Sequence, residues 1–313
     1  MFQYAFRVPD KKRVRIIIHS DAKNEADDQY AIAHALMTPG FDVRGIVAGH
    51  FNRINCLNHR FPDGQTARAG FDEIQKILDL MDLSGQYPVY MGSEKELSDE
   101  KVPVRSDGAE FIVEEAMKDD ERPLYILMQG AITDLASAVL MKPEICTRMT
   151  AIWVGGGNYP DGGIEFNMAM DPAAANVVFS SKMPLWQIPL NTYKQMAVSF
   201  TELQAKVLPY GAIGRYLFEQ MAELNEKLGD NPDWPHGEIW GLGDNSAIAV
   251  LLEEKDKTDS YELMEAPRVD LKTFRYIHGT GYRKIRVYHN LNDRLTLEDF
   301  FCKLRINYAS SDE

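Results

Sequence analysis

The sequence has 313 residues, of which 45% are hydrophobic and 26% charged, as is usual for a globular protein with a buried core. Its formal charge of −13 argues against nucleic acid or an anionic membrane as a partner, because both need a basic surface. No apolar stretch has the length of a membrane span and no charged-then-apolar leader opens the chain, so a cytoplasmic protein is expected. The three cysteines lack metal-site spacing and are expected to be reduced thiols.

Short apolar strands alternate with helical patterns over the first two thirds of the chain. A strand at 14–18 precedes a helix over 27–37, which Pro39-Gly40 ends. Further strands are predicted at 42–47, 87–90, 124–128, 149–154 and 185–188, and further helices at 67–81, 108–118, 132–141 and 172–180. This alternation is typical of a parallel sheet with helices on both faces.

The last third of the chain has a different pattern. A helical pair over 201–228 is broken at 209–211, and a helix at 243–254, a strand at 284–289 and a helix at 295–304 follow. No segment is rich enough in Pro, Gly or Ser to be a linker. We therefore predict a single α/β domain over 1–313: a mostly parallel open sheet with extra helices and strands in the C-terminal third.

Four acidic side chains follow the first strand, in the stretch RVRIIIHSDAKNEADDQY: Asp21, Glu25, Asp27 and Asp28. In an open parallel sheet, ligands bind at the carboxyl ends of the strands. A helix cap explains one such aspartate, but four acids in eight residues repel one another and need an offsetting charge. A hard cation such as Ca²⁺ or Mg²⁺, which prefers oxygen ligands, would supply it.

Other metal and phosphate motifs fit the sequence poorly. The loop DAKNEADDQYAI lacks the central glycine of an EF-hand and ends in Ile32 where that motif needs glutamate. No cysteine or histidine cluster lies nearby, which disfavours zinc. There is no Walker motif, and Gly155-Gly156-Gly157 does not fit the GxGxxG spacing.

The acidic stretch resembles the N-terminal signature of the nucleoside hydrolases (inosine–uridine preferring type), in which a strand runs into D-x-D-P-G-x-D-D. Asp21 takes the place of the second aspartate, and Asp27 and Asp28 that of the final pair. His19 stands where the family has its first aspartate. The loop 22–26 is two residues longer than usual, so Glu25 has no counterpart and is left out of the predicted cation site.

Later segments resemble the family in the same order. GIVAGHFN (45–52) is similar to GITTVxGN, and ILMQGAITDLASAVLMKPEI (126–145) to LGPLTNIAxALxxxPEI. IWVGGGN (152–158) resembles I-V-x-M-G-G, and IEFNMAMDPAAANVVF (164–179) resembles AEFNxxxDPEAAxxVF. WGLGDNSAIAVLL (240–252) resembles the segment in which an aspartate completes the metal site.

The resemblance implies Ca²⁺-dependent hydrolysis of the N-glycosidic bond of ribonucleosides by a metal-bound water that Asp21 activates as general base. The implied metal ligands are Asp21, Asp27, Asp28, the backbone carbonyl of Gln129, and Asp244. The implied substrate contacts are Asp27, Asn52, Asn158, Glu165, Asn167 and Trp240. Each also has a structural alternative, since such residues commonly form turns, cap helices or stabilise loops.

The residues expected near the leaving base differ most from the family pattern. The family often has a histidine shortly before the metal-binding aspartate, where this chain has Gly241-Leu242-Gly243. His236 is then the nearest candidate for the general acid, unless it is a surface loop histidine, and Trp240 is expected to stack on a base. The family's HGxxGL stretch is also altered, to Arg105-Ser106-Asp107-Gly108. The resemblance therefore leaves the choice of nucleoside open.

Two other functions remain open from the sequence. One is a sugar- or nucleoside-binding protein on the same fold that has lost catalysis. The other is a metal-dependent hydrolase of another riboside, or of a different glycosidic or phosphate ester bond. The need for Asp21 distinguishes the binding protein from an enzyme, since turnover needs a general base and binding does not. The family forms dimers and tetramers, so a homodimer or homotetramer is expected.

Overall fold

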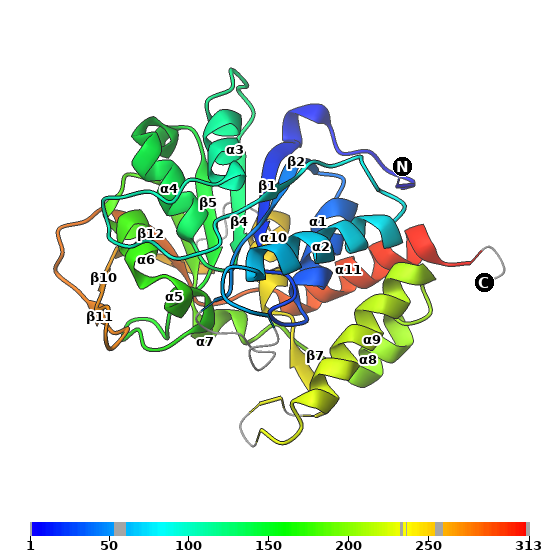
Figure 1. Ribbon diagram of the computed structural model, residues 1–313. Helices are drawn as coiled ribbons and strands as arrows, with labels where there is room; N and C mark the ends of the chain where they lie inside the picture. Colours follow the sequence, from blue (N-terminus) through cyan, green and yellow to red (C-terminus); the bar gives the residue numbers. More distant parts are fainter. Residues whose placement is uncertain (1, 53–60, 232–233, 236, 254–258, 311–313) are drawn as a thin grey trace.

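The computed structural model describes residues 2–52, 61–231, 234–235, 237–253 and 259–310. Its centre is an eight-stranded sheet in the order β3-β2-β1-β4-β5-β6-β12-β9 (Figure 1). The strands are β1 (Val14–Ser20), β2 (Phe41–Ala48), β3 (Val89–Met91), β4 (Leu124–Gln129), β5 (Thr150–Val154), β6 (Leu185–Ile188), β9 (Tyr261–Glu265) and β12 (Lys284–Tyr288). All neighbours pair in parallel except β9 and β12.

The order of the strands reverses between β1 and β4. From β1 the chain moves outward through β2 to β3, then returns to β4 on the other side of β1 and moves outward again. The carboxyl ends of these two strands, at Ser20 and Gln129, are register partners. This reversal is the position at which open α/β sheets bind ligands.

Strand β1 is buried on both faces. Ile16 and Ile18 belong to the core on one side of the sheet, and Ile17 belongs to the core on the other. Because side chains alternate along a strand, an uninterrupted run of β-branched residues fills both cores.

Helices cover both faces of the sheet (Figure 1). One core is completed by α1 (Asp28–Met37), α2 (Thr66–Leu80), α9 (Gly211–Lys227), α10 (Ser246–Leu252) and α11 (Asp293–Tyr308). The other is completed by α3 (Asp107–Ala116), α4 (Thr133–Met141) and α6 (Pro172–Ser180). Among the described residues, none of the helices combines the length and apolarity that a membrane crossing requires.

The remaining elements are short. They are α5 (Phe166–Met170), α7 (Leu190–Tyr193), α8 (Phe200–Lys206), the 3₁₀ turns η1 (Asp10–Lys12), η2 (Pro143–Thr147) and η3 (Gly243–Asn245), and the two-stranded pairs β7 (Ala197–Ser199) with β8 (Ile239–Gly241) and β10 (Arg268–Val269) with β11 (Tyr276–Ile277). Several of these short elements, α5, α7, β8 and η3 among them, carry residues that line the cavities described below.

The predicted fold class, a mostly parallel open sheet with helices on both faces, is confirmed. The C-terminal third needed corrections. The helix predicted at 243–254 begins as η3 and becomes α-helical only over Ser246–Leu252, and the last helix is longer than predicted, running over Asp293–Tyr308. Strand β9 was not predicted, because it pairs only along the edge of the sheet and exposes Glu262 and Leu263, so it has no apolar run.

Candidate active site

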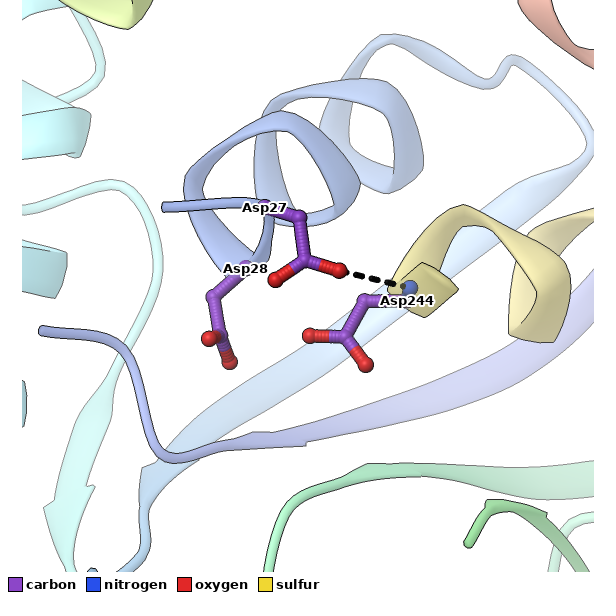
Figure 2. Close-up of side chains that lie close together, drawn as sticks. All are labelled: Asp27, Asp28 and Asp244. Carbon is purple, nitrogen blue, oxygen red and sulfur yellow. Dashed lines mark hydrogen bonds between the residues drawn. The ribbon is translucent and has the colours of Figure 1, made fainter. Parts of the chain in front are cut away.

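Three aspartates lie side by side at the carboxyl edge of the sheet (Figure 2). Asp27 directly precedes α1, Asp28 is the first residue of that helix, and Asp244 comes from η3, more than 200 residues later in the chain. One carboxylate oxygen from each lies within 4.8 Å of the others, and all three side chains are buried. This is a spacing at which one cation can contact all three oxygens.

Hydrogen bonds hold the carboxylates of Asp27 and Asp28. The backbone N–H of Asp244 donates to Oδ2 of Asp27 at 3.1 Å, the contact drawn in Figure 2. The Ser20 hydroxyl donates to Oδ1 of Asp28 at 2.5 Å. The end of β1, the start of α1 and η3 are therefore held together through the acidic groups themselves, which limits how far the carboxylates can move apart.

The protein environment disfavours the charged form of these carboxylates. Burial, partly offset by backbone hydrogen bonds from Asp244 and its neighbours, raises the pKa of Asp27 to about 6. Burial and the nearby acidic charges raise the pKa values of Asp28 and Asp244 well above their ordinary values. A bound divalent cation acts in the opposite direction, because it favours ionised carboxylates.

Asp21 lies in the same cavity, directly after β1. Asn24 Nδ2 donates to its Oδ2 at 3.1 Å, and Gly130 packs so closely that a Cβ there would lie 2.8 Å from Oδ1. Burial raises the pKa of Asp21 to about 8, with the Asn24 hydrogen bond opposing this and the Asp27 charge adding to it. A carboxyl group with an elevated pKa is suited to accept a proton from water.

Gln129 ends β4 next to the cluster. Its side-chain amide donates to the backbone carbonyl of Asp244 at 3.1 Å, and its own backbone carbonyl accepts the N–H of Asp21 at 3.5 Å. Its Oε1 is buried without a hydrogen-bond partner among the described residues. The role predicted for its carbonyl as a metal ligand stays a prediction.

Glu165 and Asn167 line the same cavity as the aspartates. Glu165 caps α5, accepting backbone N–H groups from Gly156 at 2.7 Å, Asn167 at 3.0 Å and Met168 at 2.9 Å. The Asn167 side chain donates to the carbonyl of Val154 at 2.8 Å. Both side chains are thus held in fixed orientations at the edge of a polar cavity.

Two predicted substrate contacts are not brought into this cavity. Asn52 donates to the carbonyl of Glu94 and accepts from the Thr66 hydroxyl at 2.7 Å, so the segment after β3 and the start of α2 occupy its side chain. Asn158 is exposed and forms a β-bridge with Gly162. Neither lines the cavities described here, and their roles stay predictions. His236 lies outside the described residues.

The site has two adjoining cavities. Half of the residues that line the inner one are acidic, namely Asp21, Glu25, Asp27, Asp28, Glu165 and Asp244. The outer one is larger and adds the apolar walls Ile164, Leu190, Trp234, Ile239 and Trp240. The pair therefore offers a polar chamber with hydrogen-bonding groups and a wider, largely aromatic and aliphatic chamber beside it.

Glu25 is a residue that sequence reasoning set aside and the structure places in the site. Its carboxylate accepts a hydrogen bond from Trp240 Nε1 at 3.2 Å, and it lines both cavities. Burial and the charges of Asp27 and Asp21 raise its pKa well above the ordinary value, while the Trp240 hydrogen bond lowers it. The lengthened loop 22–26 marked a departure from the family beside the acidic motif, but it did not show which side chains enter the cavity, since Lys23 of the same loop pairs with Glu73 instead.

Asn24, Phe166 and Tyr193 also line the inner cavity and were missed. Asn24 shares the inserted loop with Glu25. Phe166 lies between the predicted Glu165 and Asn167, so its place could have been inferred from theirs. Tyr193 lies in α7, in a stretch that carries no recognised motif, and no signal in the sequence pointed to it.

Comparisons with known proteins agree with this geometry. The family described as inosine-uridine preferring nucleoside hydrolase matches residues 16–296. The pyrimidine-specific ribonucleoside hydrolase RihA of Salmonella enteritidis is 25% identical over 258 residues, covering 76% of this chain and 79% of that protein. The inosine-uridine preferring nucleoside hydrolase of Leishmania major is 24% identical over 148 residues, so the matched region spans 46% of either protein.

Solved structures share the fold. A purine-preferring ribonucleoside hydrolase from Gardnerella vaginalis superposes with a TM-score of 0.72 at 20% identity, covering 94% of this chain and 98% of that one. The plant nucleoside hydrolase PpNRh1 gives a TM-score of 0.73 at 16% identity, covering 95% and 99%. Because the family match extends over most of the sheet and all the acidic residues of the site, this chain belongs to the inosine-uridine preferring nucleoside hydrolase family.

Proposed function

We propose that this protein hydrolyses the N-glycosidic bond of ribonucleosides, releasing the base and ribose, and that it uses Ca²⁺ to do so. The observation that carries the proposal is the buried group of Asp27, Asp28 and Asp244 with Asp21 in the same cavity. Family membership supports the reaction class. The relatives' names cover both purine and pyrimidine substrates, so the base is left to experiment.

The donor set fits a hard cation. Three buried carboxyl groups with raised pKa values bind protons unless positive charge keeps them ionised, and the buried Oε1 of Gln129 lacks a hydrogen-bond partner among the described residues. The nearby ligand atoms are oxygens, which Ca²⁺ prefers. Asp27, Asp28 and Asp244 would hold the ion, with Asp21 and the Gln129 carbonyl as the further predicted ligands. Bound Ca²⁺ would supply the charge that keeps the carboxylates ionised and orients water and sugar hydroxyls.

The remaining steps, which are proton transfer, sugar binding and base binding, are carried out by side chains of the protein. Asp21 takes a proton from the attacking water, while Asp27, Glu165 and Asn167 bind the sugar hydroxyls. As the C1′–N bond breaks, positive charge develops on the sugar ring, and the surrounding carboxylates stabilise it. The water oxygen bonds to C1′ and the electron pair of the broken bond leaves with the base. Trp240 and Trp234 offer aromatic walls for that base.

A reducing-sugar assay over a panel of purine and pyrimidine nucleosides with Ca²⁺ tests the proposal. Wild-type protein should release ribose from at least one nucleoside, and Asp21→Asn should lower kcat by about 10³-fold because it removes the base. Asp10→Asn, at an exposed position in η1, is the matched control and should leave kcat unchanged. Calorimetric binding of a nucleoside without ribose release would instead favour a binding protein. The expected homodimer or homotetramer stays a prediction, which light scattering would check.

A further inference from the structure

Tyr193 fills the space beside Asp244 where a side chain would otherwise stand. A Cβ placed on Gly243 would lie 2.9 Å from Cδ2 of the Tyr193 ring. Gly243 is not among the glycines with positive φ, so its backbone conformation does not demand glycine. The absence of a side chain at 243 therefore makes room for the phenol ring, which arrives from α7 on a different part of the chain.

The Tyr193 hydroxyl lies at the boundary between the two cavities. It donates to Oε1 of Glu165 at 2.9 Å, on the sugar-binding wall, and the residue lines both the inner and the outer cavity. A nucleoside with its sugar among the carboxylates and its base between the aromatic walls would place the C1′–N bond at this boundary. The phenol is then next to the bond that breaks.

The other residues at the boundary hold no side-chain donor unless a carboxyl group is protonated. The described residues that line both cavities are Glu25, Asp27, Glu165, Phe166, Tyr193 and Gly243. Three of these are acidic, and all three accept hydrogen bonds, Glu25 from Trp240, Asp27 from Asp244 and Glu165 from three backbone N–H groups. One is a hydrocarbon ring and one has no side chain. Among them only Tyr193 has a donor that does not depend on protonating a carboxylate.

We propose that Tyr193 contacts the leaving base, its single O–H turning from Oε1 of Glu165 to the base atom that gains negative charge as the C1′–N bond breaks. This inference rests on the proposed nucleoside hydrolysis. The electron pair of the bond passes to the base, the water oxygen bonds to C1′, and the water's proton goes to Asp21. The base takes its own proton from solvent in the outer cavity, so one water is consumed overall.

The test compares substrates that share the ribosyl group but differ in how stable their leaving group is once the glycosidic bond breaks. The bases of the nucleosides that wild-type protein hydrolyses depart as poorly stabilised anions. p-Nitrophenyl β-D-riboside releases a stable phenolate, and 7-methylguanosine carries a cationic base, so both leave with little assistance. Tyr193→Phe should lower kcat/KM for the nucleosides by about 100-fold and for the activated ribosides by less than about threefold.

Equal losses on both kinds of substrate would overturn the proposal, because the hydroxyl would then act through Glu165 on the sugar that they share. Unchanged activity on both would also overturn it. Tyr308→Phe is the matched control. It removes a hydroxyl that donates a hydrogen bond to the carbonyl of Met81 outside both cavities, and it should leave kcat/KM unchanged for both kinds of substrate. If wild-type protein releases ribose from no substrate, the proposed function fails. Wild-type activity with an unaffected Tyr193→Phe variant defeats only the role of Tyr193.

Discussion

The Nε2 atom of His19 lies 2.9 Å from Oδ2 of Asp134, and both side chains are fully buried. Burial alone would raise the pKa of Asp134, but the hydrogen bond and charge of His19, with donors from Ser106 and Ser93, hold it below its usual value. The pair joins the end of β1 to the first turn of α4. In the family motifs D-x-D-P-G-x-D-D and LGPLTNIA that this chain resembles, the positions matched by His19 and Asp134 are aspartate and asparagine.

The first prediction concerns the residue types at positions 19 and 134. His19→Asp would place two carboxylates in contact without solvent, and the free energy of unfolding should fall by about 3–5 kcal/mol. The double variant His19→Asp/Asp134→Asn restores a compatible acid–amide pair and should recover most of that loss. Urea unfolding at a fixed Ca²⁺ concentration measures both. A double variant no more stable than His19→Asp would show that the two positions are independent.

The second prediction concerns calcium. An ion bound only by the folded protein at 100 times its dissociation constant should raise the free energy of unfolding by about 2.7 kcal/mol. Asp28→Asn removes one of the three clustered carboxylates and should abolish most of that gain, whereas exposed Asp10→Asn should preserve it. Thermal unfolding with Ca²⁺ and with EDTA gives the comparison. An identical gain in Asp28→Asn and wild type would place the ion elsewhere.

The sheet was predictable because its central strands are buried on both faces. Strands β1 and β4 are apolar runs of the length that parallel sheets require, and the helices between them show clear stop signals such as Pro39-Gly40. The edge strand β9 was not predictable from periodicity, since one edge pairs with β12 and its side chains are half exposed. Its position is set by tertiary pairing.

The site was predictable where a motif fixes both residue type and position. Asp27, Asp28 and Asp244 were expected to meet, and they do. Tyr193 could not be foreseen, because its contact with Glu165 depends on how the chain turns after β6. Glu25 was set aside because an insertion has no counterpart to compare, yet the direction in which a short loop turns decides whether its side chains enter the cavity.

The third prediction concerns pH. Burial lowers the pKa of both His34 and His50 to about 4, against about 6.5 in an unfolded chain. Between these values only the unfolded chain binds the protons, so the stability present above pH 6.5 is lost as pH falls toward 4. Each histidine should cost about 2 kcal/mol at pH 5.

The difference between variants isolates this effect from other titrating groups. His50→Gln should lose stability less steeply than wild type between pH 7 and pH 5, by the contribution of one histidine. The exposed His289→Gln is the control and should follow the wild-type slope. Parallel curves for His50→Gln and wild type would show that His50 takes up its proton without unfolding.

The last prediction concerns the contact between Glu25 and Trp240. The Glu25 carboxylate accepts the indole N–H at 3.2 Å and thereby fixes the ring as one wall of the outer cavity. Glu25→Ala releases the ring, and losing the hydrogen bond that orients it should raise KM for nucleosides about tenfold, with kcat within about threefold. Glu25→Gln keeps an acceptor oxygen for the indole and should stay near the wild-type KM. Exposed Glu238→Ala, just before β8, is the control for charge alone. If Glu25→Gln is as damaging as Glu25→Ala, the carboxylate acts on the substrate directly and the indole contact is incidental.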